Sequence, residues 1–508
     1  MDGTKLTTTR ETMKKIGLLL PLILLSMAGL AQQTNKRTIV TTDGEIDDVD
    51  TFIRFLLYTN EFDTEGLVYS SSMWHWKGDG KGTTQVSEME MTRNMYGERK
   101  ELRWPGTNWM QELLTEYDKV HANLKLHDQN FPTAKELLAL VKVGNIDFEG
   151  DMEKRTEGSE WIAQKLLDGD DREIFLQAWG GTNTIARALK SIEEDHSGTE
   201  NWHAIKEKVS KKAILYTIMD QDATYRNYIG PNWPEIRVFY NANQFWCFAY
   251  PWKQVVPKEQ QPYLEGSFMG ANIINGHGPF LQKYYSHGDG QKQAGDPDHF
   301  QGDIAKITNT AVGSFGKYDF ISEGDSPAFL HLVEVGLDNY EDPSYGGWSG
   351  RFVKSADNPY RYDDGDAASD LNPLTGKLDK SYAQTRWIKP IQLDFAARAD
   401  WCIKTFEEAN HAPQIKVAEG RAIAVRPGET VTLNLSSNDV DGHPVYFTVW
   451  PYGEAGAGLT TVEQKSDIAK VNIPTTAKAG EKYHVIVEGT DTGFPALTRY
   501  QRVIFTVK

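Results

Sequence analysis

The sequence has few cysteines, no excess of basic charge and no internal repeat. Only Cys247 and Cys402 occur among 508 residues, so the chain is not a disulfide scaffold. They could pair in an oxidising compartment or remain separate buried thiols. The formal net charge is −17, which excludes nucleic acid as an expected partner because a phosphate backbone requires a basic face. An acidic chain suits a soluble protein with a cation-binding site.

Long apolar runs are also scarce, and the clear one lies near the N-terminus. Lys14 and Lys15 precede the apolar residues 16–31, and Gly29 and Ala31 place small residues where a signal peptidase cleaves. A membrane anchor is the alternative, but the run is short for a bilayer span. We therefore expect residues 1–31 to be a cleaved signal peptide. The protein is then secreted or periplasmic, without stable membrane insertion after cleavage.

Strand-like and helix-like segments alternate from residue 36 to residue 405. Strands are expected at residues 38–40, 66–69, 174–176, 213–218 and 318–321. Helical spacing of apolar residues separates them, as in residues 49–57 and 161–167. This alternation predicts an α/β domain with a doubly wound, mostly parallel sheet. Ligands bind beyond the carboxyl ends of the strands in such sheets.

Helical periodicity disappears in the last hundred residues. Short alternating segments such as 430–433, 445–447 and 483–488 are separated by turn-forming clusters. This pattern predicts an all-β, immunoglobulin-like sandwich over residues 412–508 that folds without the rest of the chain. One of its turns, Asp-Val-Asp-Gly at residues 439–442, is interpreted as a plain β-turn, with a second calcium site as the alternative.

The densest group of carboxylates follows the first predicted strand. Residues 41–48 read Thr-Thr-Asp-Gly-Glu-Ile-Asp-Asp and lead into the first helix. An Asp-Gly pair forms turns and an aspartate caps helices. One cap does not need three aspartates and a glutamate, however. Crowded carboxylates repel one another, and a hard cation with oxygen ligands relieves the repulsion.

Two other strand ends supply possible partners for these carboxylates. The two glycines after Trp179 allow a sharp turn that exposes its carbonyl. Asp325 precedes Pro327, so it either caps a helix or binds a cation. Gln221 and Asp222 follow a third strand and either bind sugar hydroxyls or begin a loop.

Aromatic residues near strand ends are candidates for sugar stacking. Trp74 and Trp76 flank His75, and Trp348 lies among glycines. Their rings either stack on a sugar or pack in the core. His75 either donates a proton to a leaving group or has a structural role.

Together these segments resemble a known superfamily. Residues 41–48 are similar to the Asp-x-Asp-x-Gly-x-Asp-Asp signature of inosine-uridine nucleoside hydrolases. The closer resemblance is to a secreted, nucleoside hydrolase-like branch described as cellulose-binding, which also carries a C-terminal β-sandwich. The segments shared with this branch are Trp-Gly-Gly-x-Asn-Thr at 179–184, Glu-Gly-Asp-Ser-Pro at 323–327 and Gly-Gly-Trp-x-Gly-Arg at 346–351. The resemblance spans residues 37–508.

The resemblance implies one calcium ion and roles for the matching residues. Asp43 would bind Ca²⁺ and act as general base toward a water held by the ion. Asp48, Asp325 and the Trp179 carbonyl would complete the protein ligands. Asp47 would bind two sugar hydroxyls, and Asn183 is a further candidate for substrate binding. Calcium accepts oxygen ligands, and carboxylates stabilise the positive charge that develops at an anomeric carbon.

Departures from the signature concern the recognition of a nucleobase. Gly324 stands where many nucleoside hydrolases have a histidine, residues 70–73 lack the expected asparagine, and Thr41 replaces the first aspartate. Glu45 adds a carboxylate that the parent enzymes lack. The metal ligands are thus retained, whereas the elements that recognise a purine or pyrimidine are not.

These observations predict a secreted, calcium-dependent hydrolase of a glycosidic bond in a plant or algal glycan or its oligosaccharides. Glu323 is the favoured general acid because it lies beside Asp325, and Glu45, Asp222 and His75 are the other candidates. The alternatives are a non-catalytic carbohydrate-binding (cellulose-binding) protein on the same fold and a true nucleoside N-ribohydrolase.

The first testable prediction concerns export. The mature protein should begin near Gln32, because signal peptidase cleaves after the small residues that end the apolar run. N-terminal sequencing of protein from the periplasm or the medium measures this. Exported material that still begins at Met1 or Met13 would contradict the prediction.

Overall fold

The computed structural model describes residues 35–295 and 297–508, together with Met1. Apart from Met1, the predicted signal peptide lies outside the described residues. Residues 35–508 form one compact unit. No helix in this described part is long and apolar enough to cross a membrane. Cys247 and Cys402 are both buried and neither forms a disulfide.

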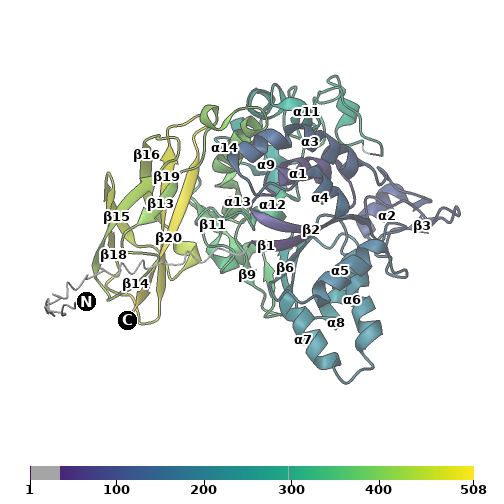
Figure 1. The fold of residues 1–508 in the computed structure, drawn as a ribbon, viewed down its shortest axis with the longest axis horizontal. Coiled ribbons are helices and arrows are strands. Elements are labelled where there is room, and N and C mark those ends of the chain that lie inside the picture. The colour runs from purple at the N-terminus through teal and green to yellow at the C-terminus, as the bar shows by residue number, and fades with distance from the viewer. Residues whose placement is uncertain (2–34, 296) are drawn as a thin grey trace. The chain divides into compact units, whose positions relative to one another are not determined.

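A large, mostly parallel sheet lies at the centre of the first 400 residues (Figure 1). Strand β1 (Lys36–Thr42) pairs in parallel with β2 (Phe62–Tyr69) on one side and with β6 (Ile174–Ala178) on the other. The eight strands follow the order β5-β2-β1-β6-β7-β8-β10-β9, and β9 and β10 pair antiparallel. The remaining strands are β5 (Val141–Val143), β7 (Ala213–Ile218), β8 (Arg237–Asn241), β9 (Val353–Lys354) and β10 (Arg361–Asp363). This confirms the predicted α/β architecture.

The direction of sheet growth reverses at β1. The chain adds β2 and β5 on one side of β1, and then returns to its other side with β6, β7 and β8. In open α/β sheets a crevice forms at such a switch point, beyond the carboxyl ends of the strands. The ends of β1 and β6, at Thr42 and Ala178, therefore flank the expected ligand site.

Helices cover both faces of this sheet (Figure 1). Alternate residues of one strand point to opposite faces, and Ile39 and Val40 of β1 accordingly belong to two separate apolar cores. The helices are α1 (Ile46–Leu56), α2 (Glu90–Tyr96), α3 (Trp109–His127), α4 (Ala134–Ala139), α5 (Glu157–Leu167), α6 (Asn183–His196), α7 (Trp202–Lys212), α8 (Gly230–Asn232), α9 (Trp252–Val255), α10 (Gly266–Met269), α11 (Gly278–Leu281), α12 (Ser326–Leu330), α13 (Tyr382–Thr385) and α14 (Ile388–Trp401). Two small antiparallel sheets of two strands pair β3 (Gln85–Val86) with β4 (Glu98–Arg99), on either side of α2, and β11 (Asp370–Asn372) with β12 (Lys377–Asp379).

The strand expected at residues 318–321 does not form. Tyr318 has a φ of 66°, which interrupts an extended segment. The Phe320 carbonyl accepts the Trp252 indole N–H at 3.0 Å, and the Phe320 amide bonds to the Leu264 carbonyl. These backbone groups thus pair with nearby loops instead of a ladder. The helix expected after them does form as α12.

The C-terminal residues form two four-stranded sheets, which confirms the predicted β-sandwich. One sheet has the order β13-β15-β18-β17 and the other the order β14-β20-β19-β16. Leu433, Val471, Val485 and Phe505 contribute to the core between them. The strands are β13 (Gln414–Val417), β14 (Ala422–Val425), β15 (Thr430–Asn438), β16 (Val445–Pro451), β17 (Thr461–Lys465), β18 (Ile468–Asn472), β19 (Lys482–Asp491) and β20 (Thr498–Val507).

The outer face of β19 and β20 packs against the rest of the chain. Ile486 and Tyr500 belong to the same apolar core as Trp387. Arg502 is fully buried and donates hydrogen bonds to the carbonyls of Leu337, Tyr345 and Gly346. The division into domains 36–405 and 412–508, and the independent folding of the second, stay predictions.

Substituting Arg502 tests how strongly this contact stabilises the protein. Arg502→Ala should lower the free energy of unfolding by about 3 kcal/mol, because it leaves buried carbonyls without a donor. Arg421→Ala is the matched control, since Arg421 is exposed and its ion pair with Asp338 should contribute about 1 kcal/mol or less. Urea denaturation measures both values. Equal losses in the two variants would contradict a stabilising role for the buried contact.

Candidate functional site

Carboxylates from two distant segments meet at the switch point of the sheet. Asp43 directly follows β1, Asp47 and Asp48 lie in the first turn of α1, and Asp325 immediately precedes α12. Asp47, Asp48 and Asp325 each offer an oxygen within 4.8 Å of the others. All four residues are buried, and none is more than 9% exposed. The structure thus brings together the acidic residues that the sequence singled out.

Asp48 and Asp325 are buried carboxyl groups without a lysine or arginine partner among the described residues. Burial, together with Asp43 and Asp325, raises the pKa of Asp48 well above its usual value. Burial and Asp47 likewise raise the pKa of Asp325. Among the described residues, no lysine or arginine forms an ion pair with Asp43, Asp48 or Asp325. Asp325 occupies the N-cap position of α12 without a capping hydrogen bond, so helix capping does not explain it.

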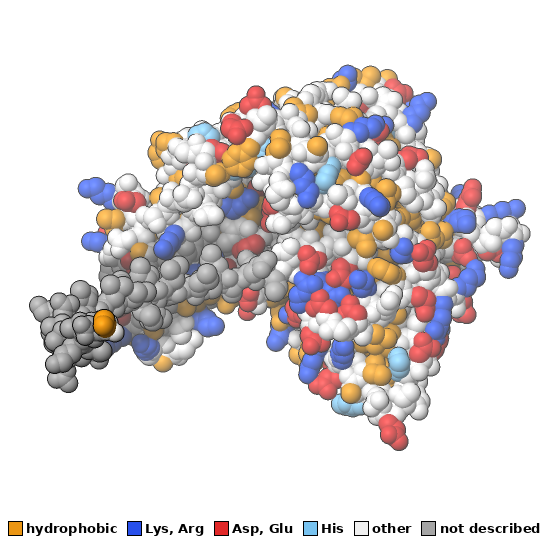
Figure 2. Space-filling model, in the orientation of Figure 1, with side chains coloured by type: hydrophobic (Ala, Val, Ile, Leu, Met, Phe, Trp, Pro, Cys, Tyr) orange, Lys and Arg blue, Asp and Glu red, His pale blue; other side chains and the backbone are white. Residues whose placement is uncertain are grey.

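Acidic groups elsewhere have a different environment. Figure 2 shows acidic and basic side chains interspersed over the visible face of the described chain. Arg155, for example, pairs with Asp195, and Arg172 with Asp170. Such exposed pairs contribute little to stability. Burying Asp48 and Asp325 without a basic partner destabilises the fold by comparison, and the oxygens of Asp47, Asp48 and Asp325 could hold a metal ion.

Asp43 also faces a second group of ionisable side chains. Its Oδ2 atom lies 3.6 Å from His75 Nδ1, and Glu45 Oε2 lies 3.9 Å from the same nitrogen. Burial opposes ionisation of Asp43, but the interactions of its carboxylate with His75, together with those with Ser72 and Asp48, lower the pKa of Asp43 overall. Asp43 Oδ2 is buried without a hydrogen-bond partner in the described structure. Asp43 therefore lies between the other carboxylates and His75.

The residues that follow β6 lie next to Asp43. A Cβ atom on Gly180 would lie 2.8 Å from the Asp43 carboxyl carbon, so only glycine permits this approach. The carbonyl of Trp179, a predicted metal ligand, accepts a hydrogen bond from the Gln221 side chain at 2.7 Å. The structure thus gives Gln221 a partner within the protein. Through this bond Gln221 positions the Trp179 carbonyl, and sugar binding by Gln221 stays a prediction.

Asn183 and Asp222 also differ from their predicted roles. The Asn183 amide donates to Ser71 Oγ at 2.9 Å and to the Asn145 carbonyl at 3.0 Å. Asp222 accepts the Asn183 backbone N–H at 2.8 Å, and burial and Asp220 raise the pKa of Asp222 to about 7. Hydrogen bonds within the protein satisfy both side chains. They hold the loop at residues 179–183 and are not directed at a ligand.

The environment of Glu323 argues against the predicted general acid. Glu323 is fully buried and pairs with Arg54, with 2.6 Å between Oε2 and Nε. It also accepts hydrogen bonds from Tyr284 and Ser326. A general acid must reach the leaving group. An enclosed ion pair cannot do so, and Glu323 therefore supports the fold around Asp325.

The aromatic candidates fall into buried and accessible residues. Trp348 is 0% exposed within the main apolar core, so the prediction that it stacks on a sugar is wrong. Trp76 is also buried, against Phe148. Trp74 is partly exposed beside the buried His75. Of the predicted stacking residues, Trp74 is thus the one whose ring is accessible to a sugar.

The structure adds three residues that no sequence pattern marks: Arg103, Tyr250 and Trp246. We call them the rim of the site. The Tyr250 hydroxyl donates to Glu45 at 3.0 Å, and Arg103 lies 3.9 Å from the same carboxylate. Arg103 in turn pairs with Asp298. Trp246 is 36% exposed, and its ring lies tilted against that of Phe245. These residues come from loops and short turns, where no periodic pattern marks them.

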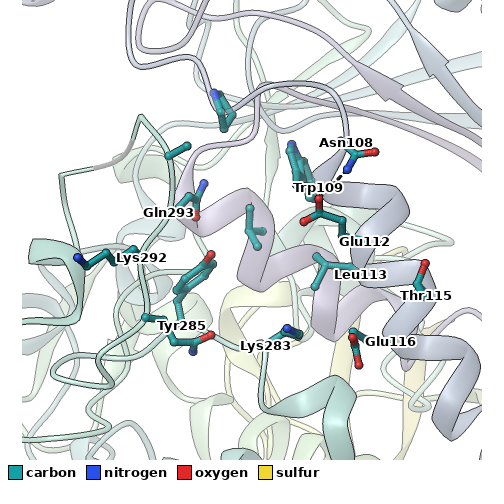
Figure 3. A pocket seen from close by; sticks show the side chains of 14 residues that line it. Asn108, Trp109, Glu112, Leu113, Thr115, Glu116, Lys283, Tyr285, Lys292 and Gln293 are labelled. Carbon is teal, nitrogen blue, oxygen red and sulfur yellow. Dashed lines mark hydrogen bonds between the residues drawn. The ribbon is translucent and has the colours of Figure 1, made fainter.

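A cavity of about 760 Å³ lies beside the Gly44 turn (Figure 3). Gln293 donates to the Gly44 carbonyl at 2.8 Å, which joins the cavity wall to the loop that carries Asp43. Figure 3 shows Trp109 and Glu112 of α3 on one side, with Tyr285 and Lys292 on the other. Aromatic rings with surrounding polar groups are suited to bind a sugar.

Comparison with known proteins identifies both parts of the chain. The family described as "Cellulose-binding Sde182, nucleoside hydrolase-like domain" matches residues 37–352. The family described as "Cellulose-binding protein Sde0182, C-terminal domain" matches residues 430–507. Among proteins with curated descriptions, none matches the sequence significantly.

One solved structure is similar over nearly the whole chain. It is a nucleoside hydrolase-related hypothetical protein from Saccharophagus degradans that is associated with carbohydrate metabolism, with a TM-score of 0.67 and 25% identity, covering 93% of this chain and 100% of that one. The effector XopQ complexed with adenosine diphosphate ribose has a TM-score of 0.35 and 10% identity, covering 73% and 95%. A plant nucleoside hydrolase has a TM-score of 0.30 and 12% identity, covering 70% and 99%. The likeness to these last two is too weak to support an inference.

The first family match extends over more than half of the sequence, and the second falls on the β-sandwich. The overall similarity to the Saccharophagus degradans protein is consistent with both matches. The chain belongs to the Sde182 family of cellulose-binding proteins with a nucleoside hydrolase-like domain.

Proposed function

We propose that this protein is a secreted, calcium-dependent hydrolase that cleaves a glycosidic bond in a plant or algal glycan or in its oligosaccharides. One observation carries the proposal: Asp47, Asp48 and Asp325 converge at the switch point of the sheet, with Asp43 beside them. The family's description as cellulose-binding supports a carbohydrate ligand. Carbohydrate binding alone does not require this cluster of carboxylates, whereas hydrolysis uses carboxylates to activate water and to stabilise positive charge at the anomeric carbon.

The donor set at this point fits calcium. Asp43, Asp48 and Asp325 would hold the ion with the Trp179 carbonyl, and all four offer oxygen, which Ca²⁺ prefers. Asp43 Oδ2 is buried and has no hydrogen-bond partner among the described residues, so it is suited to bind a cation. When bound, the ion would supply positive charge that neutralises the carboxylates and acidifies a nearby water.

The remaining chemistry belongs to the side chains around the carboxylates. Asp43 would accept the proton of the attacking water, and Asp47 would bind sugar hydroxyls. Negative charge from both would stabilise the oxocarbenium-like transition state. With Glu323 enclosed in an ion pair, Glu45 and His75 remain as candidates to protonate the leaving oxygen. Tyr250 and Arg103 would position Glu45 for that step.

An exposed aromatic ring near the carboxylates offers a platform for the sugar. A Cβ atom on Gly324 would lie 3.0 Å from Asp47 Oδ2 and 3.3 Å from Phe245, so these two residues are neighbours. Trp246 adjoins Phe245, with 4.3 Å between the ring centroids. We propose that Trp246 and Trp74 stack on sugar rings at the rim of the site.

A second candidate function is glycan binding without catalysis. It is favoured by the family's description and by the cavity between Trp109 and Tyr285, which lies beside the carboxylates rather than over them. A nucleoside N-ribohydrolase is the third candidate, because the metal-binding aspartates are those that a nucleoside hydrolase would use. The glycine at position 324 and residues 70–73 count against it.

Calcium should stabilise the folded protein. Removing the ion leaves buried like charges facing one another, so chelator should lower the melting temperature. At a calcium concentration 100-fold above the Kd, the stabilisation should be about 2.7 kcal/mol. Asp48→Asn should lose this response, yet should be at least as stable as the wild type in chelator because one repelling charge is gone.

Differential scanning fluorimetry in chelator and in millimolar calcium measures these effects. Asp366→Asn is the matched control, since the Asp366 carboxylate is 96% exposed and its charge therefore has little effect on stability. It should keep the full calcium response. Identical melting curves in chelator and in calcium for the wild type would exclude the site.

Catalysis is tested with nucleosides, aryl furanosides, aryl pyranosides and oligosaccharides, all assayed with calcium. We expect turnover of a glycoside or an oligosaccharide, and a loss of about 100- to 10,000-fold in kcat for Asp43→Asn, because a general base contributes that much. Asp366→Asn should retain full activity. Inosine or uridine cleavage without glycoside turnover would favour the nucleoside hydrolase. Glycan binding without any turnover would favour the non-catalytic alternative.

A further inference from the structure

A further group of possible metal ligands lies in the C-terminal sandwich, far along the sequence from the switch point. Asp439, Asp441 and His443, in the turn between β15 and β16, each offer a ligand atom within 4.8 Å of the others. The group combines two carboxylates with an imidazole. At the switch point, Asp47, Asp48 and Asp325 offer oxygen donors alone, whereas Asp43, Glu45 and His75 form a group of the mixed type.

The Asp439 carboxylate is buried, and one of its two oxygens is available to bind a metal ion. Its side chain is only 4% exposed. Oδ1 accepts the backbone N–H groups of Asp441 and His443, each at 3.0 Å. Oδ2 is buried and has no hydrogen-bond partner in the described part of the chain. A buried carboxylate oxygen is costly without a donor or a cation. The backbone of the turn thus supplies hydrogen-bond donors for Oδ1 of Asp439 but none for Oδ2.

Asn410 completes the arrangement from the segment that precedes the sandwich. Its amide nitrogen donates to Asp491 Oδ1 at 3.1 Å, to Oδ2 at 3.0 Å and to the Pro495 carbonyl at 2.8 Å. These bonds orient the amide, and Asn410 Oδ1 lies 3.0 Å from His443 Nδ1. The Asn410 oxygen therefore faces the same group of ligands.

We propose that Asp439, Asp441, His443 and the Asn410 side-chain oxygen form a site for a divalent transition-metal ion such as Zn²⁺ or Mn²⁺. Carboxylates and an imidazole suit these ions, whereas Ca²⁺ takes oxygen ligands. A cavity of about 480 Å³ lined by Asn410, Asp441, His443 and Phe494 provides an entry path.

The ion would stabilise the junction between the sandwich and the preceding chain. Asp441 Oδ2 accepts the His411 backbone N–H at 2.6 Å, and Asp441 Oδ1 lies 3.0 Å from His411 Nδ1. His411 Nε2 in turn lies 2.9 Å from Nδ1 of His127, the last residue of α3. An ion bound to Asp441 would therefore hold the linker, α3 and the sandwich together.

Asp439→Asn tests the proposal with little change in shape. Asparagine retains Oδ1 as acceptor for the two backbone N–H groups and removes the buried charge. In an Asp48→Asn/His75→Gln background, which removes one ligand from each group at the switch point, we expect one Zn²⁺ per chain. Asp439→Asn and His443→Gln should each weaken this binding by about 100-fold or more, because each removes a direct ligand. Asp467→Asn, an exposed residue of the same sandwich, is the charge-matched control.

Isothermal titration with Zn²⁺, repeated with Mn²⁺, measures affinity and stoichiometry, and circular dichroism confirms that each variant is folded. If this background does not fold, a stoichiometry lower by one ion in Asp439→Asn than in the full wild-type chain gives the same answer. Retained Zn²⁺ and Mn²⁺ binding in Asp439→Asn in the Asp48→Asn/His75→Gln background would overturn the proposal. So would the absence of both ions from the background itself. Neither result depends on glycoside hydrolysis or on calcium at the switch point.

Discussion

Repulsion among buried carboxylates is the constraint around which the α/β part of the protein is built. Asp43 and Asp48 lie on one segment and Asp325 on another, and burial together with mutual repulsion raises the pKa of Asp48 and Asp325. Protein groups offset this only in part, through the Thr42 hydroxyl on Asp48 and the imidazole of His75 beside Asp43. Burying these carboxylates together destabilises the fold unless a cation offsets their repulsion, and their oxygens could hold one.

The surrounding structure holds the loops that meet at this point. Gly180 allows β6 to approach Asp43 closely, and Gln221 holds the Trp179 carbonyl. Asp222 anchors the start of α6, while the Arg54–Glu323 ion pair supports the segment that carries Asp325. These residues are polar and buried, yet their partners lie within the protein. They are better understood as positioning residues than as ligands of substrate.

The β-sandwich is attached to the rest of the chain by contacts that are both apolar and polar. Tyr500 packs against Trp387 in the main core, and Arg499 pairs with Asp394 of α14 at 2.8 Å. Arg502 satisfies carbonyls of the segment that leads from α12 toward β9. At the far end of the same interface, His411 connects Asp441 to α3. The sandwich is therefore oriented by several independent contacts.

The sequence alone determined the alternation of strands and helices, the β-sandwich and the aspartates at the carboxyl end of β1, because each depends on local spacing or on neighbouring residues. Only the tertiary structure decided which polar side chains have partners inside the protein. Glu323 pairs with Arg54, which lies 269 residues away, and Trp348 is enclosed by the core. Such contacts depend on the arrangement of distant segments, and no local pattern records it. For the same reason the rim residues Arg103 and Tyr250 became visible only in three dimensions.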